Sequence, residues 1–130
     1  MQETGRGKRS EVVAMIRIKR IYEPPAAEDG LRILVDRLWP RGLTKDKAKV
    51  DLWAKEIAPS HELRQWYGHD PVKWEEFKKK YRKEIENEEE WIDFIAQRAK
   101  KGTVTFLFSC QEQKLNNAAA LKEFFQNKFR

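Results

Sequence analysis

The sequence predicts an α/β fold, a layered fold in which helices flank a small, mainly parallel β-sheet. Runs rich in apolar and β-branched residues, at 31–39 and 103–110, have the composition of buried strands. Stretches with apolar residues at helical spacing lie between these runs, and a last such stretch follows at 116–129. Strands that alternate with helices form parallel sheets covered by helices, so a layered architecture is expected.

The amino-terminal part is predicted to contribute two strands. The first covers residues 15–22, where isoleucines alternate with basic residues and indicate a strand with one exposed face. A turn-rich connection at 23–30 leads to the second strand, at 31–39, whose apolar centre indicates burial. Pro40 and Gly42 end that strand, so a loop is expected there.

The middle of the chain is predicted to be mostly helical. Residues 44–50 fit a short helix with Thr44 as its cap, whereas 51–59 fits a helix or a short strand equally well. A helix at 60–67 begins at Ser60, whose hydroxyl is a favoured amino-terminal cap. The segment between these two helices therefore keeps two alternative assignments.

The carboxyl-terminal half carries the clearest helical patterns. Apolar residues at helical spacing, with capping residues at the ends, predict three helices: one opened by Asp70 and Pro71 and continuing through Ile85, one at 88–101 ended by Gly102, and one at 116–129 capped by Asn116 or Asn117. The strand at 103–110 precedes the last of them. The prediction of a parallel sheet depends most on this strand–loop–helix ending.

Length, charge and cysteine content limit how many domains, membrane spans and disulfides the chain can have. With 130 residues it is long enough for one domain, expected at 15–130, after a flexible basic leader at 1–14. Most of the net charge of +6 lies near the start, because residues 1–20 hold six basic and two acidic side chains, against 21 and 19 in the rest. No apolar run has the length of a membrane span, and the single cysteine excludes an internal disulfide. A soluble, cytoplasmic protein is expected.

The stretch DRLWPRG, residues 36–42, is the first candidate site, because ligands of open α/β sheets gather beyond the carboxyl ends of strands. Arg37 and Arg41 offer planar donor forks suited to phosphate or carboxylate, and Asp36 can orient an arginine or accept a hydrogen bond from a ligand. Trp39 supplies a flat stacking face, and Gly42 permits unusual backbone angles. The alternative is structural: an Asp36–Arg37 ion pair, a buried tryptophan and a simple turn.

The second candidate region follows the last predicted strand and has the sequence SCQEQKLNN. Ser109, Glu112, Asn116 and Asn117 are polar groups near the strand exit, with turn and helix-cap roles as the alternative. Cys110 lies between a strand and a helix, as some catalytic thiols do, yet no arginine closes the loop after it in the manner of a phosphatase. A buried, unreactive thiol is therefore the preferred interpretation.

Metal and cofactor sites are not predicted. The two histidines, His61 and His69, lack the spacing of a metal-binding motif, and the acidic run 88–90 is typical of the first turn of a helix. Neither GxGxxG nor GxxxxGK occurs, so the sequence lacks the usual phosphate-binding loops of nucleotide cofactors. No metal and no cofactor is therefore expected.

Four blocks together resemble the YeaO-like branch of the domain-of-unknown-function 488 (DUF488) family: RILVDRLWPRGLTK, DLWAKEIAPSHELRQWYGHDPVKWEEFKKKY, TVTFLFS and NNAAALKEFF. The resemblance runs from about Met15 to the carboxyl terminus and implies a small cytoplasmic α/β protein, without implying an activity. The family's polar motifs fall on three groups of positions: Asp36, Arg37, Trp39, Pro40, Arg41 and Gly42; Ser60, Glu62, Leu63, Arg64 and Trp66; and Asn116, Asn117 and Ala118. On that ground Ser60 and Arg64 join the candidate ligand-binding residues.

The chain departs from the family pattern in the loop after its last strand, where the resemblance implies YSAKD…HNNA. Cys110 stands in place of alanine, Gln111 of a basic residue, Glu112 of aspartate and Leu115 of histidine. A mechanism that needs that aspartate, lysine or histidine has no counterpart in these residues. Cysteine in the place of a residue without a nucleophilic group also argues against a catalytic thiol.

Three functions from different classes are compatible with these residues. The favoured one is binding of a small anionic molecule, bearing phosphate or carboxylate, by Arg37, Arg41 and Arg64 near Trp39; whether the protein is an enzyme stays open. One alternative is association with nucleic acid through the basic leader and aromatic residues. Another is a protein-interaction module whose tryptophans lie on a partner surface. The favoured function requires that the guanidinium groups converge on one hollow beside the start of the last helix.

Overall fold

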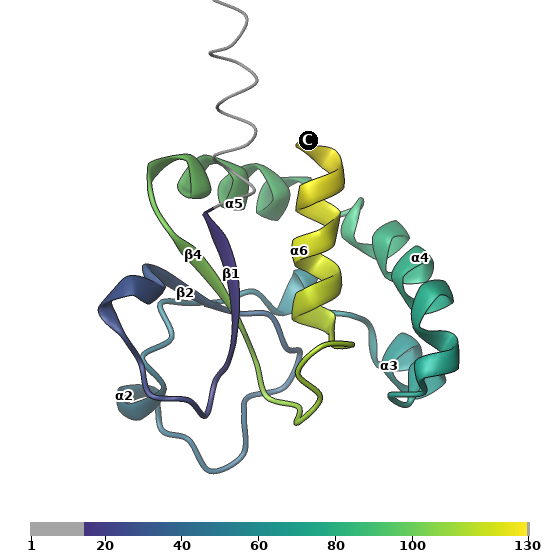
Figure 1. The fold of residues 1–130 in the computed structure, drawn as a ribbon, viewed down its shortest axis with the longest axis horizontal. Helices are drawn as coiled ribbons and strands as arrows, with labels where there is room; N and C mark the ends of the chain where they lie inside the picture. The colour runs from purple at the N-terminus through teal and green to yellow at the C-terminus, as the bar shows by residue number, and fades with distance from the viewer. Residues whose placement is uncertain (1–14, 130) are drawn as a thin grey trace, which may run out of the picture.

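The structure, a computed structural model, describes residues 15–129, and its centre is a four-stranded sheet (Figure 1). The strands are β1 (Ile16–Arg20), β2 (Leu31–Leu34), β3 (Leu52–Trp53) and β4 (Val104–Phe108). Their pairings are parallel, in the order β1-β4-β2-β3. The predicted α/β class with a small, mainly parallel sheet is therefore confirmed. The leader expected at 1–14 lies outside the described residues.

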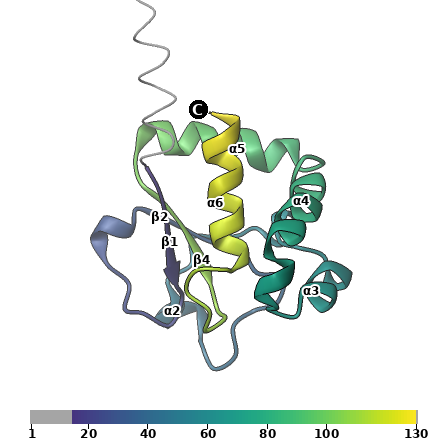
Figure 2. The same ribbon diagram turned by 45° about the vertical axis from the view of Figure 1, so that its right-hand side comes forward.

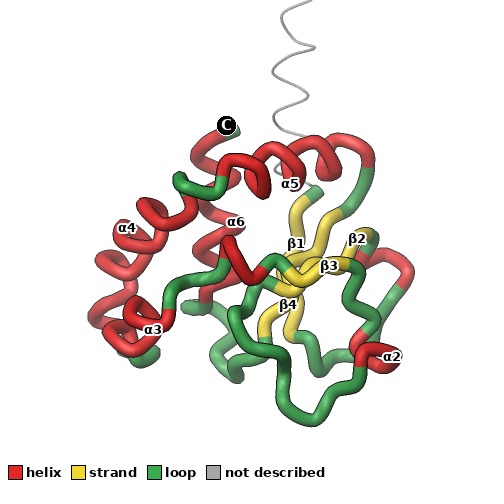
Figure 3. Tube along the Cα trace, turned by 180° about the vertical axis from the view of Figure 1, so that it is seen from behind, coloured by secondary structure: helices red, strands yellow, loops and turns green. Residues whose placement is uncertain are grey.

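Helices connect the strands and cover the sheet unequally. The α-helices are α2 (Lys45–Ala48), α3 (His61–Tyr67), α4 (Trp74–Ile85), α5 (Glu89–Lys101) and α6 (Asn117–Lys128), and the 3-10 turns are η1 (Ala27–Asp29), η2 (Lys55–Ile57) and η3 (Pro71–Lys73). Three long helices, α4, α5 and α6, gather on one side of the sheet, while the short α2 lies apart from them (Figures 2 and 3). Within residues 15–129, no helix is long and apolar enough to cross a membrane.

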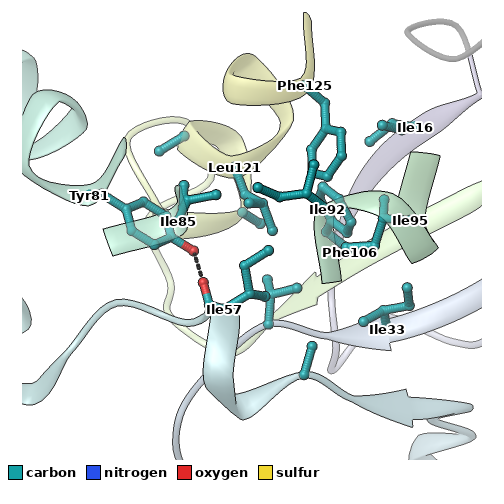
Figure 4. Close-up of a cluster of buried hydrophobic side chains, with 14 of the residues drawn as sticks. Ile16, Ile33, Ile57, Tyr81, Ile85, Ile92, Ile95, Phe106, Leu121 and Phe125 are labelled. Carbon is teal, nitrogen blue, oxygen red and sulfur yellow. Dashed lines mark hydrogen bonds between the residues drawn. The ribbon is translucent and has the colours of Figure 1, made fainter. Parts of the chain in front are cut away.

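The main hydrophobic core lies between the sheet and the long helices. Along β4, Val104, Phe106 and Phe108 contribute to this core, whereas Leu107 belongs to a smaller cluster on the opposite face. Figure 4 shows the main core, in which Phe106 and Phe125 lie among isoleucines. Because both faces of β4 are buried, its sequence is a continuous apolar run rather than an alternating one.

Tyr81 is a polar residue within this core. Its hydroxyl donates a hydrogen bond of 2.6 Å to the carbonyl oxygen of Ile57, which Figure 4 shows as a dashed line. Burial, together with the nearby charge of Asp36, raises the pKa of the Tyr81 phenol well above its ordinary value of 10.0. The neutral hydroxyl therefore holds η2, just before α3, against α4.

The second strand is shorter than predicted, because it ends at Leu34 rather than at residue 39. The Val35 N–H still donates to the Leu107 carbonyl at 3.1 Å, but the next side chain, Asp36, bonds to the loop after β4. The chain therefore leaves the sheet at Asp36. This early exit leaves the rest of DRLWPRG free to form a loop.

The boundaries in the middle of the chain also differ from the prediction. The helix expected at 44–50 ends at Ala48, because Lys49 adopts a left-handed conformation with φ of 48°. The segment 51–59 contains both alternatives in sequence, since β3 is followed directly by η2. Asp70 caps the short turn η3 rather than α4 itself, which begins at Trp74.

Gly30 allows β2 to begin close to β4. Its φ of 63° lies in the left-handed region, and a Cβ atom at this position would collide with the main-chain carbonyl of Thr103. That same carbonyl accepts a 2.9 Å hydrogen bond from the Leu31 N–H, the first residue of β2. A side chain at position 30 would therefore push β2 away from β4.

Candidate functional site

The candidate site is a pocket of about 530 Å³, lined in part by the loops after β1, β2 and β4. These loops lie beyond the carboxyl ends of the strands (Figure 1). Residues of α3, the turn that follows it, α4 and α6 complete its wall. The residues that line it are Tyr22, Asp36, Arg37, Leu38, Trp39, Pro40, Arg41, Pro59, His61, Arg64, Gln65, Tyr67, His69, Phe77, Ser109, Cys110 and Asn117. Seven of the predicted site residues are therefore brought together: Asp36, Arg37, Trp39, Arg41, Arg64, Ser109 and Asn117.

Asp36 connects the loop after β2 to the loop after β4 and to α6. Its Oδ2 accepts hydrogen bonds from the Ser109 N–H at 2.9 Å and from the Ser109 hydroxyl at 2.7 Å. Its Oδ1 accepts from the Asn117 amide at 3.1 Å, and its main-chain carbonyl accepts from the Trp53 indole at 2.7 Å. Hydrogen bonds to an ionised carboxylate are stronger than neutral ones, so Asp36 fixes this wall of the pocket.

Arg37 connects the same loop to the residues before α3. Its Nε donates to the Pro59 carbonyl at 3.1 Å, and one terminal nitrogen donates to the Ala58 carbonyl at 2.9 Å. Across the described chain, no ion pair joins Arg37 to Asp36, so the alternative of an Asp36–Arg37 ion pair is wrong. Arg37 therefore positions the pocket wall, with part of its guanidinium already occupied.

Trp39 and Gly42 shape the DRLWPRG loop mainly through contacts and backbone geometry outside the pocket. The Trp39 indole donates to the Leu43 carbonyl at 2.7 Å, and its ring packs edge-on against Trp53 at 5.4 Å between centroids. Trp39 thereby joins the small cluster on the second face of the sheet while still lining the pocket. Gly42 has φ of 82°, which requires a glycine-like conformation, but it does not line the pocket.

Arg41 and Arg64 are the cations of the pocket that remain available. They come from different elements, the DRLWPRG loop and α3, and both side chains are exposed. The main-chain carbonyl of Arg41 accepts a 2.7 Å hydrogen bond from the Tyr22 hydroxyl. This bond fixes the backbone of the loop and does not involve the guanidinium. Neither guanidinium has a hydrogen-bond or ion-pair partner among residues 15–129. An external anion can therefore use them without displacing a protein partner.

Ser60, predicted as a site residue, has a structural position outside the pocket lining. Its hydroxyl accepts from the Leu63 N–H at 3.1 Å as the amino-terminal cap of α3, and donates to Glu84 at 2.6 Å. The Ser60 N–H also donates to Glu84, at 2.8 Å. The pair locks the start of α3 to α4 and so fixes the helix that presents Arg64.

Asn116 and Glu112 also lie outside the lining, in the turn and cap roles that were the alternative. Asn116 is buried and caps α6, accepting from the Ala119 N–H at 2.8 Å. The exposed Glu112 carboxylate accepts from the N–H groups of Lys114 and Leu115 at 2.9 and 3.1 Å, and these bonds lower its pKa. Both residues shape the loop that carries Ser109 without reaching the pocket.

Cys110 lines the pocket, but its surroundings do not activate a thiolate. Burial raises the pKa of the Cys110 thiol, and the negative charge of Asp36 raises it further. The thiol lies 3.5 Å from the Glu112 carbonyl, in position to donate to it. Catalytic cysteines need the opposite environment, one that lowers the thiol pKa.

The pocket also contains residues that were not among the predicted site residues. Tyr22, Gln65, Tyr67 and both histidines line it, whereas the sequence gives no metal-binding spacing to His61 and His69. His61, Gln65 and Tyr67 lie within three residues of Arg64, and this proximity is a signal that the sequence offers for placing them in the site. In the described part of the chain, no group of three or more His, Cys, Asp or Glu side chains could hold a metal ion.

A family model described as "Inactive DUF488-N3 subclade" matches residues 15–130. The chain belongs to the DUF488 family. It is 39% identical to "Uncharacterized protein YeaO" of Escherichia coli over 112 residues, which cover 86% of this chain and 97% of that protein. The DUF488 resemblance of the sequence blocks, including its YeaO-like branch, is therefore confirmed.

Mycobacterial proteins match this DUF488 chain over a shorter region. "Uncharacterized protein Rv3073c" of Mycobacterium tuberculosis and "Uncharacterized protein Mb3100c" of Mycobacterium bovis are each 47% identical to it over 70 residues, 54% of this chain. The match spans 59% of the length of these mycobacterial relatives. No solved structure matches the chain.

Proposed function

We propose that the pocket at the carboxyl edge of the sheet binds a small anionic molecule, with its phosphate or carboxylate group held by Arg41 and Arg64. The observation that carries this proposal is that two exposed arginines from separate elements, neither with a partner for its guanidinium among residues 15–129, line the same pocket. The planar guanidinium fork matches both anions. Asp36, Arg37 and Glu84 hold the supporting loops through hydrogen bonds, so the site is preorganised.

The size of the pocket supports a small-molecule ligand. Its volume of about 530 Å³ falls within the range typical of such sites, roughly 300–1,000 Å³. Aromatic and proline side chains contribute to the lining beside the arginines, notably Tyr67, Phe77 and Pro59. A mixture of apolar walls and a few polar groups is typical of pockets that bind organic molecules.

Binding is proposed rather than catalysis. The raised pKa of the Cys110 thiol disfavours a nucleophile, and the Asp36 carboxylate is already engaged by Ser109 and Asn117. The family description of the matching subclade as inactive agrees with this choice. The glutamate and leucine at positions 112 and 115 stand where the family resemblance implies aspartate and histidine.

The proposal is tested by titrating the full chain with phenyl phosphate and following the indole N–H signals by NMR. Trp39 lines the pocket, so its signal should shift, while Trp91, whose indole bonds to Glu56, serves as the internal reference. Arg41→Ala should weaken binding about tenfold or more, since a charge-assisted hydrogen bond contributes roughly 1.5–3 kcal/mol.

The matched control is Arg98→Ala, which removes an exposed arginine on α5, outside the pocket. It should leave the affinity unchanged, and both variants should keep the wild-type melting temperature, because surface substitutions rarely change stability by more than about 0.5 kcal/mol. Unfolding of Arg41→Ala would show that this arginine is structural, and a titration without a Trp39 response would show that the pocket does not bind the anion.

The nucleic-acid and protein-interaction alternatives remain predictions. The first depends on a leader that lies outside the described residues, and it requires that replacing Arg6, Lys8 and Arg9 by alanine weakens a gel shift of the full chain. The second was predicted for tryptophans on a partner surface, and all five tryptophans are half-buried. Of the exposed large apolar side chains among residues 15–129, Leu38 and Tyr22 line the pocket and Val72 lies outside it.

A further inference from the structure

The pocket has an internal polarity. Arg41 and Arg64 are exposed, whereas Asp36 is half-buried, and Asp36 is the acidic residue among the described side chains of the lining. The two available cations therefore lie toward solvent, whereas Asp36 lies in the more buried part of the lining, beside Arg37, whose guanidinium already donates to the carbonyls of Pro59 and Ala58. A ligand that fills the pocket meets two available guanidinium groups near solvent and the Asp36 carboxylate at its more buried end.

Within residues 15–129, three hydrogen bonds reach the Asp36 carboxylate, which leaves one acceptor position without a donor from this part of the chain. A carboxylate offers about four lone-pair sites, two on each oxygen. Ser109 fills two sites on Oδ2, through its N–H and its hydroxyl, and Asn117 fills one on Oδ1. The remaining site on Oδ1 belongs to a side chain that lines the pocket and can accept from a ligand N–H or O–H group.

This arrangement of charges disfavours the binding of an anion that would place negative charge beside Asp36. A second negative group next to the half-buried Asp36 carboxylate would be repelled, whereas an N–H or O–H donor would be attracted. The volume of about 530 Å³ is also many times the roughly 30 Å³ of a water molecule, so a lone inorganic anion would leave most of it unfilled. Tyr67, Phe77 and Pro59 are also part of the lining and offer apolar surface to the body of an organic ligand.

We propose that the ligand is an organic anion that carries a hydrogen-bond donor at the end opposite its acidic group, with the acid at Arg41 and Arg64 and the donor at Asp36 Oδ1. This inference rests on the proposed anion site and adds the chemical class of its ligand. Asp36 thereby acts as a specificity-determining residue, in addition to its bonds to Ser109 and Asn117.

The test compares probes that differ only in the donor. Para-aminophenyl phosphate and para-methylphenyl phosphate have nearly the same shape, but only the first carries an N–H donor; the meta isomers form a second matched pair. Wild-type protein should bind one amino probe about tenfold more tightly than its methyl partner, since a hydrogen bond to a charged group is worth roughly that factor. The Trp39 indole signal, with Trp91 as reference, reports the affinities.

Asp36→Asn supplies the second readout. In this variant the ratio of the affinities for the amino and methyl probes should fall to about one, because the inner end of the pocket then carries an amide in place of a negative charge. A purely structural Asp36 would weaken both probes equally and leave their ratio intact, which would overturn the inference.

The outcomes separate this inference from the proposed function. If wild-type protein binds amino and methyl probes equally and Arg41→Ala weakens both, the anion site stands and the donor selection is wrong. If no probe shifts the Trp39 signal, the proposed function and the inference both fail. A tenfold preference that disappears in Asp36→Asn supports both.

Discussion

The two ends of strand β2 each carry an aspartate and an arginine, and they use them in opposite ways. At the amino end, Asp29 and Arg32 are 2% and 4% exposed and bond to each other at 2.6 Å, with Lys19 adding a second contact to Asp29 at 3.0 Å. Arg32 also donates to the carbonyls of Ala48 and Lys49, at 2.8 and 3.0 Å. This cluster is closed, because the charges satisfy one another inside the protein.

At the carboxyl end, Asp36 and Arg37 bond away from each other. Asp36 bonds to Ser109 and Asn117, and Arg37 to the carbonyls that precede α3. Both side chains are half-buried, and the space between their partners is the pocket. Two opposite charges therefore form a buried ion pair when the side chains bond to each other. When each side chain bonds to a different element instead, the two become part of a pocket wall.

The largest effect is expected from breaking the closed end with Asp29→Ala. Removing the carboxylate leaves Arg32 buried and Lys19 partly buried without their counter-charge, which typically destabilises a protein by about 3–5 kcal/mol. The free energy of unfolding is measured by urea denaturation. Asp93→Ala, an exposed aspartate on α5, is the control and should cost less than about 0.5 kcal/mol. Equal losses in both variants would contradict a closed cluster.

A smaller loss is expected at the open end from Asp36→Ala. It removes three hydrogen bonds, but their donors are half-buried and can bind water instead, so we expect a loss of about 1–3 kcal/mol. The same urea titration measures it. Asp36→Asn, which keeps an acceptor oxygen for Ser109, should lose less. A loss larger than that of Asp29→Ala would reverse the comparison.

The smallest effect is expected from pH, because protonation removes only the charge of Asp29. Burial raises the Asp29 pKa, but the hydrogen bond from the Ala26 N–H, with those from Lys19 and Arg32, outweighs burial and brings it below 3.8. Above 3.8 this stabilisation is fully present, and it is lost as pH falls through the lowered pKa of the folded state. Urea titrations between about pH 6 and pH 2 should show a shallower loss in Asp29→Asn than in the wild type.

Much of the fold could be predicted because its signals are local. The apolar run of β4 and the helical spacing in α4 each occupy a dozen residues or fewer, and burial on one or both faces determines both patterns. The end of β2 could not be predicted in the same way. Val35 continues the apolar run, and the strand ends where the Asp36 carboxylate accepts hydrogen bonds from Ser109, 73 residues further along the chain.

The same distinction holds for the candidate site. Arg41 could be selected from the chemistry of its own loop, because that loop follows a predicted strand, whereas Arg64 was selected through the resemblance to the family. The cap role of Ser60 was predicted, but its bond to Glu84 and its distance from the pocket depend on how α3 meets α4. The closed Asp29–Arg32 cluster could not be predicted, because Arg32 lies within an apolar run and its partners come from other elements of the chain.

The pairing of β1 with β4 has a consequence for how the chain acquires its structure. Ile16 lies beside Val104 and Arg20 beside Phe108, so the edge strand made first during synthesis finds its neighbour only after some 90 further residues have been made. Contacts between such distant residues form slowly, since a long loop must close before they bring any gain. Until β4 has been made, the backbone N–H and C=O groups of β1 lack their pairing strand. We therefore expect the nascent chain to be most prone to aggregation during that interval.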